Sequence, residues 1–216
     1  MLYNFVRFIV LVYFKLYHRL SIYDKDKVPV NKPIIFASNH ASYLDPPVVG
    51  LAAFPIRLRF IAWDKLFRVP LFGTFLLAMG AVPVSSNDKV SSAALLRMVI
   101  GFLENGENVF ICPEGHRSED GTLQPLEGGV AVLSLKTGAP IIPTWAGGTF
   151  RSLAPHMKFP RPRKVTVTFG DIIDPSTFPS EFDEKEKRKY ILEKIEEFYI
   201  KMDLKDREKY PRKKDK

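Results

Sequence analysis

The chain has 216 residues, of which 46% are apolar, and this length suits a single domain with a sizeable core. Its one cysteine excludes an intrachain disulfide, which makes a cytoplasmic setting natural. The formal net charge is +8, but the basic residues are not interleaved with aromatic residues in the body of the chain, which argues against a nucleic-acid partner.

The positive charge is concentrated at the two ends of the chain. Residues 1–20 contain three Lys or Arg residues and no acid, and residues 205–216 contain seven Lys or Arg against three Asp or Glu. Basic ends on a nearly neutral body suit an anionic lipid surface. The alternative for residues 205–216 is a solvated, flexible basic tail.

Residues 1–20 predict an amphipathic helix. The longest uninterrupted apolar run, residues 8–14, is held between Arg7 and Lys15. A membrane-spanning helix needs about 20 mostly apolar residues, so this run is too short to cross. The segment also has no small-residue cleavage site, which argues against a secretory signal. A broad apolar face with a narrow basic stripe is typical of a helix that lies in the membrane interface. The alternative is that the apolar face packs against the domain.

The next segment carries the most informative pair of residues. Residues 34–39 read as a buried strand, and they lead into Asn39-His40-Ala41-Ser42-Tyr43-Leu44-Asp45. Histidine is suited to accept a proton near neutral pH, and a carboxylate five residues on can orient the imidazole. Because Asp45 precedes Pro46-Pro47, the alternative is that Asp45 caps the next helix and His40 is a loop residue.

The middle of the chain alternates between predicted helices and strands. Helices are expected over residues 46–53, 66–79 and 88–105, with strands over 57–62 and 81–84. Asp88 is a plausible cap for the third of these helices, and Gly106 a plausible stop. In residues 66–79, Pro70 and Gly73 predict a kinked or two-part helix, whose apolar side chains either enter lipid or form core.

A second polar motif follows a predicted strand at residues 108–112. It reads Pro113-Glu114-Gly115-His116-Arg117-Ser118, a loop in which Arg117 could contact a phosphate and Glu114 could position a hydroxyl or a cation. The alternative is a solvated turn with an internal Glu–Arg pair. Cys112 raises a rival mechanism, a nucleophilic triad with His40 and Asp45, although its apolar strand favours a buried thiol.

The rest of the chain completes an α/β pattern. Helices are expected over residues 128–137 and 183–203 and strands over 140–145 and 165–170, with a loop rich in Pro, Arg and Lys at residues 151–164. The predicted fold class is α/β, a single domain with a mixed, largely parallel sheet flanked by helices. The expected divisions are an interfacial membrane-anchoring helix at 1–20, the main domain at 21–204 and the basic tail at 205–216.

These motifs together resemble the glycerolipid acyltransferase family that includes 1-acylglycerol-3-phosphate acyltransferase. That family carries Asn-His-x4-Asp, then a Gly-apolar segment ending in Arg, then Pro-Glu-Gly-Thr-Arg-Ser, then an apolar strand with Pro. The corresponding segments here are residues 39–45, 80–86, 113–118 and 139–143, in the same order over residues 25–175. His116 replaces the threonine of the third motif.

The sequence departs from the family at three positions that are usually basic. Trp63, Ser86 and Glu127 stand where the family has lysine, arginine and lysine. The resemblance assigns those positions to the phosphate of the acceptor. Lys65, Lys89 and Arg97 are candidates to compensate.

The resemblance implies transfer of a fatty acyl group from acyl-CoA or acyl-carrier protein to the hydroxyl of a lysophospholipid. The first candidate acceptor is 1-acyl-sn-glycerol-3-phosphate, which would give phosphatidic acid. His40 would act as the base with Asp45, at the cytoplasmic face of the membrane and without a metal or cofactor. Oxyanion donors are expected near Gly115 or at the start of the helix after Asp45. The expected substrate-binding residues are Asn39, Lys65, Glu114, Gly115, Arg117 and Ser118.

Three alternatives to this function stay open. The acceptor could be a different lysolipid, because the three substitutions alter the expected phosphate site. The same His–Asp pair could serve a thioesterase or lipid hydrolase, or the protein could bind lipid without catalysis. The acyl-chain length, the choice between the two donors and the oligomeric state are not fixed by the sequence.

Overall fold

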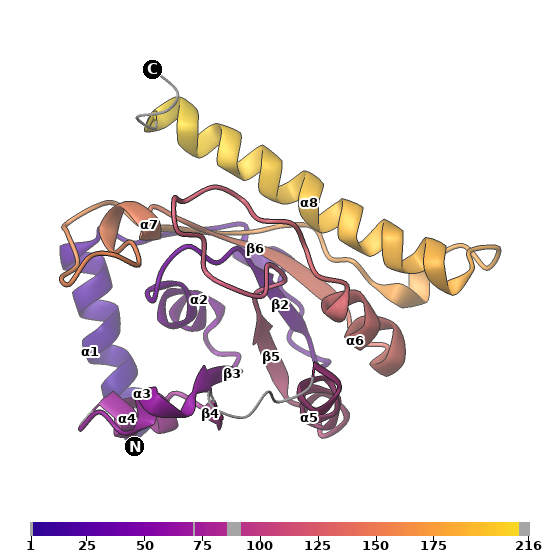
Figure 1. The fold of residues 1–216 in the computed structure, drawn as a ribbon, viewed down its shortest axis with the longest axis horizontal. Coiled ribbons are helices and arrows are strands. Elements are labelled where there is room, and N and C mark those ends of the chain that lie inside the picture. Colours follow the sequence, from indigo (N-terminus) through magenta and orange to yellow (C-terminus); the bar gives the residue numbers. More distant parts are fainter. Residues whose placement is uncertain (1, 71, 86–91, 212–216) are drawn as a thin grey trace.

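A computed structural model describes residues 2–70, 72–85 and 92–211 (Figure 1). Seven strands form one sheet in the order β1-β7-β6-β2-β5-β3-β4, in which only the β6–β7 pair is antiparallel. The strands are β1 (Ser21–Tyr23), β2 (Ile35–Ser38), β3 (Leu58–Trp63), β4 (Ala81–Val84), β5 (Asn108–Ile111), β6 (Ile141–Gly147) and β7 (Thr166–Phe169). The predicted α/β fold with a mixed, largely parallel sheet is confirmed.

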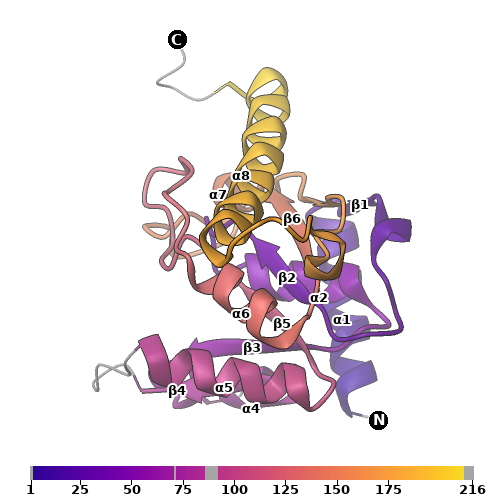
Figure 2. The same cartoon turned by 90° about the vertical axis from the view of Figure 1, so that its right-hand side faces the viewer.

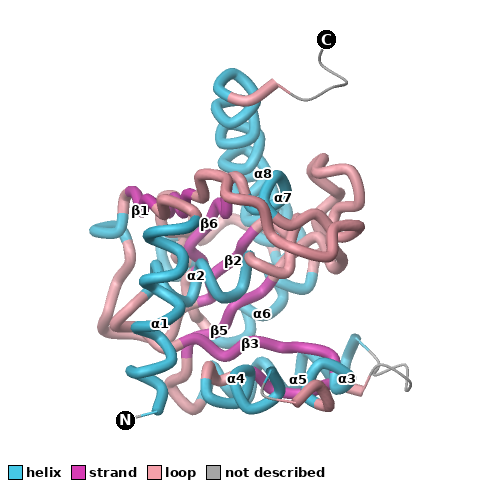
Figure 3. The backbone as a smooth tube through the Cα atoms, turned by 90° about the vertical axis from the view of Figure 1, so that its left-hand side faces the viewer, coloured by secondary structure: helices cyan, strands magenta, loops and turns pink. Residues whose placement is uncertain are grey.

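Helices cover both faces of this sheet (Figures 2 and 3). They are α1 (Leu2–Tyr17), α2 (Asp45–Ala53), α3 (Asp64–Phe67), α4 (Phe72–Ala78), α5 (Ser92–Glu104), α6 (Gly129–Thr137), α7 (Thr149–Ser152) and α8 (Glu184–Lys209), with short 3-10 turns η1 (Lys25–Lys27) and η2 (Pro175–Thr177).

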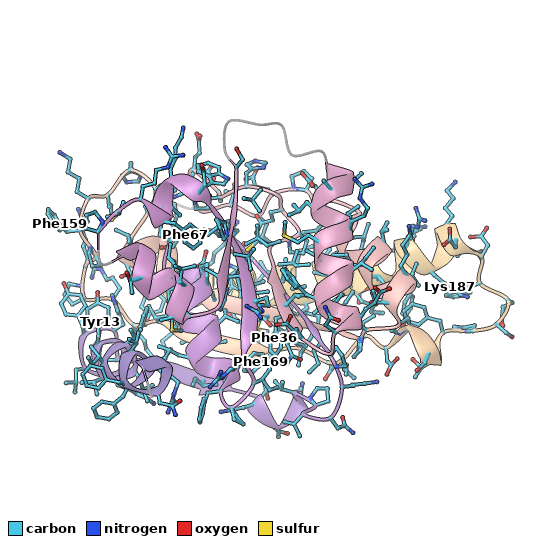
Figure 4. The ribbon with its side chains drawn as sticks, turned by 90° about the horizontal axis from the view of Figure 1, so that it is seen from below. Tyr13, Phe36, Phe67, Phe159, Phe169 and Lys187 are labelled. Atoms are coloured by element: carbon cyan, nitrogen blue, oxygen red, sulfur yellow. The ribbon has the colours of Figure 1, made fainter. Side chains whose placement is uncertain are left out.

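Two hydrophobic cores lie on opposite faces of the sheet. Phe36 of β2 packs into the core shared with α1 and α2, whereas its neighbour Ile35 packs into the core shared with α5, α6 and α8. All four residues of β2 are buried. Central parallel strands are buried on both faces in this way, which is why β2 reads as an uninterrupted apolar run. Figure 4 shows Phe36 and Phe169 in the interior, and Phe159 and Lys187 at opposite ends of the molecule.

Most predicted elements are present within two or three residues of their expected bounds. The segment predicted as a kinked or two-part helix forms α3 and α4, separated around Pro70. Gly73 is required there, because a Cβ atom at this position would collide with the carbonyl group of Phe67. Strand β1 and helix α7 were not predicted; each has only three or four residues, too few for a periodic signal. Asp88, the predicted cap, lies outside the described residues.

Helix α8 is longer than expected. It begins with a capping box between Asp183 and Glu186 and continues to Lys209, five residues into the segment predicted to be a flexible tail. Ile191, Ile195 and Tyr199 lie one turn apart along its buried side. The carboxyl-terminal part of α8 extends beyond the body of the molecule (Figure 2).

Helix α1 packs on the domain with one side and exposes large apolar side chains on the other. Phe14 is buried in the core, so the helix packs on the domain. Phe5, Phe8 and Leu16 nevertheless have 63%, 60% and 78% of their surface exposed. Within the described part of the chain, none of the helices has both the length and the apolar character needed to cross a bilayer.

Candidate active site

Most of the predicted functional residues meet where two adjacent parallel strands end. His40 follows the carboxyl end of β2, and the loop that begins at Pro113 follows the carboxyl end of the adjacent strand β5. In open α/β sheets, the crevice outside the carboxyl ends of the strands is the usual ligand-binding position. The sheet topology therefore brings together two motifs separated by about 70 residues of sequence.

His40 and Asp45 form a hydrogen-bonded pair. The Nδ1 atom of His40 lies 3.1 Å from Oδ2 of Asp45. The Asp45 side chain is fully buried, whereas 20% of the His40 side chain is exposed. A carboxylate on Nδ1 favours the tautomer with the proton on that nitrogen and leaves Nε2 free to accept a proton. This is the arrangement required of an oriented general base.

Asp45 holds the turn around His40 and does not cap α2. Its Oδ2 atom also accepts hydrogen bonds from the backbone N–H groups of Ala41 (2.8 Å) and Ser42 (2.7 Å). Helix α2 starts at Asp45 itself, with Leu44 at the N-cap and no side-chain cap. The alternative in which Asp45 is an N-cap is therefore wrong, because its carboxylate faces back along the chain toward His40.

Glu114 supports His40 from the second motif. Its two carboxylate oxygens accept hydrogen bonds from the backbone N–H of His40 (2.7 Å) and of Gln124 (2.8 Å). Burial raises the pKa of the Glu114 carboxyl above its usual value of 4.5, and the two N–H donors oppose that rise. With only 2% of its surface exposed, Glu114 is placed to position His40, whereas the sequence suggested contact with an acceptor hydroxyl.

Ser118 and Asn39 also connect the backbone around the site. The N–H of Ser118 donates to the carbonyl oxygen of His40 at 2.8 Å. The Asn39 side chain accepts a hydrogen bond from the N–H of Ala146 in β6 at 2.7 Å. Both side chains are at least 96% buried. These two residues, predicted to bind substrate, are instead placed to fix β2 and the two loops relative to each other.

Arg117 stands over the ring of Tyr43 beside His40. Its guanidinium carbon lies 3.6 Å from the ring centroid, in a cation–π contact. The Nη1 atom of Arg117 is buried and has no hydrogen-bond partner among the described residues. Tyr43 was missed as a site residue because its contact partner lies 74 positions away and nothing in its own segment indicates it. The pair presents a positioned cation whose donors suit a phosphate.

Gly115 and Glu127 are in close contact next to these residues. Gly115 has a φ of 73°, in the left-handed region, and a Cβ atom there would collide with the carboxylate of Glu127. Glu127 is held by its backbone N–H, which donates to the carbonyl oxygen of Pro113 at 2.7 Å. An exposed carboxylate therefore lies against the second motif, where the resembling family has a lysine.

The two places where the sequence expects oxyanion donors, near Gly115 and at the start of α2, differ in the N–H groups that they offer. The N–H of Gly115 donates to Cys112, and that of Asp45 donates to Ser42. Pro46 and Pro47 have no N–H, so the first turn of α2 offers no donor. In the described structure, the backbone N–H groups of His116 and Arg117 have no assigned acceptor.

Two further candidate residues do not act with the His–Asp pair: Lys65 lies away from it, and Cys112 is unsuited to be a nucleophile. Lys65 is exposed on α3, which follows β3, and β3 is two strands from β2 in the sheet. Burial, followed by the charges of Asp45 and Glu114, raises the pKa of the Cys112 thiol well above its usual value. A protonated thiol is a poor nucleophile, which counts against the Cys112 triad. No group of three His, Cys, Asp or Glu side chains suited to a metal ion occurs among the residues with described positions.

The fold and the site define an α/β protein with a His–Asp pair at the carboxyl edge of a largely parallel sheet. Residues 19–147, more than half of the chain, match the model of the family described as Acyltransferase. The chain belongs to this acyltransferase family. Ser86, one of the three departures from the family pattern, lies outside the described residues, whereas Trp63 and Glu127 are both exposed.

Named relatives are similar over the same region. A chloroplastic 1-acyl-sn-glycerol-3-phosphate acyltransferase of Brassica napus is 32% identical over 144 residues, which cover 62% of this chain and 41% of that protein. The 1-acyl-sn-glycerol-3-phosphate acyltransferase of Bacillus subtilis (strain 168) is 27% identical over 124 residues, covering 57% of this chain and 60% of that protein. The chain thus spans about two fifths of the length of the Brassica relative that it matches.

A crystal structure shares the fold. It is that of the 1-acyl-sn-glycerophosphate (LPA) acyltransferase PlsC from Thermotoga maritima, which superposes with a TM-score of 0.75. The match covers 93% of this chain and 79% of the Thermotoga chain, at 24% sequence identity. The likeness supports the same α/β architecture.

Proposed function

We propose that the protein transfers a fatty acyl group from an acyl thioester to the free hydroxyl of 1-acyl-sn-glycerol-3-phosphate, giving phosphatidic acid. The observation that carries the proposal is the pairing of His40 Nδ1 with the buried carboxylate of Asp45 at 3.1 Å. Relatives named for this reaction, and membership of the acyltransferase family, support the choice of substrates.

The chemistry proposed for His40 is general-base and then general-acid catalysis. Nε2 removes the proton of the acceptor hydroxyl as its oxygen bonds to the thioester carbonyl carbon. Collapse of the tetrahedral adduct breaks the C–S bond, and the imidazolium returns the proton to the departing thiolate. Asp45 stabilises the imidazolium throughout. The backbone N–H groups of His116 and Arg117 are the candidate donors to the oxyanion.

Arg117 is the proposed contact for the phosphate of the acceptor. The Nη1 atom of its guanidinium is buried and has no hydrogen-bond partner among the described residues, so it can donate to a phosphate. Arg117 is held near His40 because the N–H of the next residue, Ser118, donates to the carbonyl oxygen of His40. Asn39, Glu114 and Ser118 hold the loops that carry His40 and Arg117 in place through their hydrogen bonds to the backbone. Gly115 leaves room for the carboxylate of Glu127 beside the loop. Lys65 is proposed to contact the acceptor only if the acceptor reaches toward α3.

The acceptor is proposed to arrive from a lipid surface on the α1 side of the molecule. Phe5, Phe8 and Leu16 expose an apolar face on α1, and Phe159 is 80% exposed on a neighbouring loop. The hydroxyl of Tyr17 donates to the carbonyl oxygen of Pro160 at 3.0 Å, which joins that loop to α1. Figure 4 shows Tyr13 and Phe159 at the same end of the molecule. An apolar face bordered by basic residues suits a peripheral protein at the cytoplasmic membrane surface.

The experiment that tests the function measures thiol release from a long-chain acyl-CoA or acyl-carrier protein. It is run with lysophosphatidate, with zwitterionic or neutral lysolipids, and without acceptor. We expect release that requires lysophosphatidate, with phosphatidate as product. Release with another lysolipid but not with lysophosphatidate would show that the acceptor differs from that of the named relatives, in line with the non-basic residues Glu127 and Trp63. Release without any acceptor would identify a thioesterase, and no release with either donor would contradict an enzymatic role.

A further inference from the structure

A pocket of about 430 Å³ lies outside the candidate active site, between β7 and the carboxyl-terminal half of α8. Thr166 and Thr168 of β7 form its floor, because the alternate residues Val167 and Phe169 point into the core on the other face of the sheet. Cavities of roughly 300–1,000 Å³ are typical of small-molecule sites. Nothing in the reaction proposed above uses this pocket.

The pocket carries an excess of positive charge. Two of the cations in its wall are paired at its ends, Lys27 with Asp171 at 2.8 Å and Arg151 with Asp206 through two hydrogen bonds. Lys164, Lys201 and Lys205 also line it, and none of the three has an ion-pair partner within the described ranges. Of the three acids in the wall, only Asp24 is outside those pairs. The surplus cations favour an anionic ligand.

The floor and wall add neutral recognition groups. The hydroxyls of Thr166 and Thr168 and the indole N–H of Trp145 have no hydrogen-bond partner in the part of the chain that is described. The ring of Phe198 and the side chain of Met202 supply an apolar wall. Unused donors below several lysines, beside an aromatic ring, suit a ligand that carries both phosphate groups and a flat ring.

One end of the pocket lies at the same edge of the sheet as His40. Thr166 pairs with Gly147 at the carboxyl end of β6, and β6 is joined to Asn39 by the hydrogen bonds of Ala146. Strand β7 is two strands from β2, which places this end of the pocket about 10 Å to the side of β2 at the usual strand spacing. A ligand in the pocket could therefore extend a flexible arm across the end of β6 to His40.

We propose that this pocket binds the phosphorylated adenosine part of an acyl-CoA donor, with Lys201 and Lys205 contacting its phosphates and Phe198 facing its base. The proposal rests on the acyl transfer proposed above and selects acyl-CoA over acyl-carrier protein. A recessed pocket with donors on its floor fits a small bisphosphate, whereas a protein partner would be recognised by a broader surface.

The test measures binding of adenosine 3′,5′-bisphosphate to the whole chain by isothermal titration calorimetry. The double substitution Lys201→Ala/Lys205→Ala should weaken binding by roughly tenfold or more. The matched control Lys185→Ala/Lys189→Ala removes the same charge from the first turns of the same helix and should leave binding unchanged. Thr168→Val, which keeps the shape of the side chain, should weaken binding by several-fold. No binding to the unsubstituted chain, or equal losses in both double variants, would overturn the proposal.

Kinetics separate this site from the catalytic site. The Lys201/Lys205 variant should raise KM for acyl-CoA by a factor similar to its loss of binding, with kcat and the KM for the acceptor unchanged. Bisphosphate binding without acyl transfer would contradict the proposed reaction and leave the pocket assigned. Acyl transfer from acyl-carrier protein without bisphosphate binding would support the proposed reaction and contradict the assignment of the pocket.

Vesicles test the other source of phosphate. Sedimentation with phosphatidylglycerol vesicles should be unaffected by Lys201→Ala/Lys205→Ala. If the variant loses vesicle binding and keeps bisphosphate binding, the pocket serves a lipid headgroup and the nucleotide assignment is wrong.

Discussion

At the scale of single residues, the contact between His40 and Asp45 dominates what the site can do. His40→Ala should lower kcat by about 10²–10⁴-fold, the usual contribution of general acid–base catalysis. Its thermal stability should change little, because among the described residues the imidazole makes a single hydrogen bond, to Asp45. The assay is thiol release from acyl-CoA with lysophosphatidate, and near-normal turnover would exclude His40 as the base.

Asp45→Ala should differ from His40→Ala in its effect on stability. The substitution removes the orienting carboxylate and also leaves the N–H groups of Ala41 and Ser42 without their acceptor. An unsatisfied buried donor costs about 1–3 kcal/mol. We therefore expect loss of activity together with a lower free energy of unfolding in urea. Equal unfolding curves for the Asp45→Ala and His40→Ala variants would show that the backbone bonds contribute nothing.

Glu114 gives the protein a pH-dependent stability. Its pKa is raised in the fold, so the native state holds its proton more tightly than the unfolded state does. The contribution of Glu114 is most favourable below its usual pKa of 4.5 and decreases as the pH rises through the raised value. The free energy of unfolding of the natural chain, relative to that of Glu114→Gln, should fall over this range. A constant difference from pH 4 to pH 7 would contradict a raised pKa.

Tyr43 is predicted to position Arg117 for the acceptor. Tyr43→Leu removes the cation–π contact, which is worth about 0.5–1 kcal/mol at an exposed site, so KM for lysophosphatidate should rise by roughly two- to fivefold. The conservative variant Tyr43→Phe keeps the ring and should keep the KM. Equal effects of the two substitutions would assign the role to the hydroxyl instead.

At the scale of the elements, α1 is both a packed helix and the proposed membrane contact. Leu16→Lys introduces a charge into its most exposed apolar position and should reduce sedimentation with anionic vesicles. Val30→Lys is a matched control, because Val30 is similarly exposed, at 76%, on a loop outside α1. Equal losses in the two variants would argue against α1 as the contact. Circular dichroism should show both proteins folded, since neither side chain is in a core.

At the scale of the whole molecule, the sheet separates two surfaces, one proposed to receive the acceptor and the other the donor. Helices α1 and α2 cover one face, and α5, α6 and α8 cover the other. The candidate active site lies at the edge between them. On these proposals, an acceptor embedded in lipid and a water-soluble donor approach His40 from opposite faces of the sheet. If both proposals hold, this geometry lets one short loop system serve two substrates of different solubility.

Features that depend on neighbouring residues could be predicted from local patterns in the sequence. Buried apolar runs predicted the central strands, Pro70 and Gly73 predicted the break between α3 and α4, and five residues of spacing joined His40 to Asp45. Each signal lies within one turn or one strand, where local conformation decides the geometry.

Roles that depend on contacts between distant residues could be assigned only from the folded chain. Glu114 bonds the backbone of His40, Tyr43 supports Arg117, and the lysines of α8 face the threonines of β7. Helix α8 also continues past the expected end of the domain, where Arg151 of α7 pairs with Asp206. The contacts of Glu114, Tyr43 and Arg151 join positions 55 to 74 residues apart. Local pattern carries no record of such pairings, because the order of strands in the sheet is what creates them.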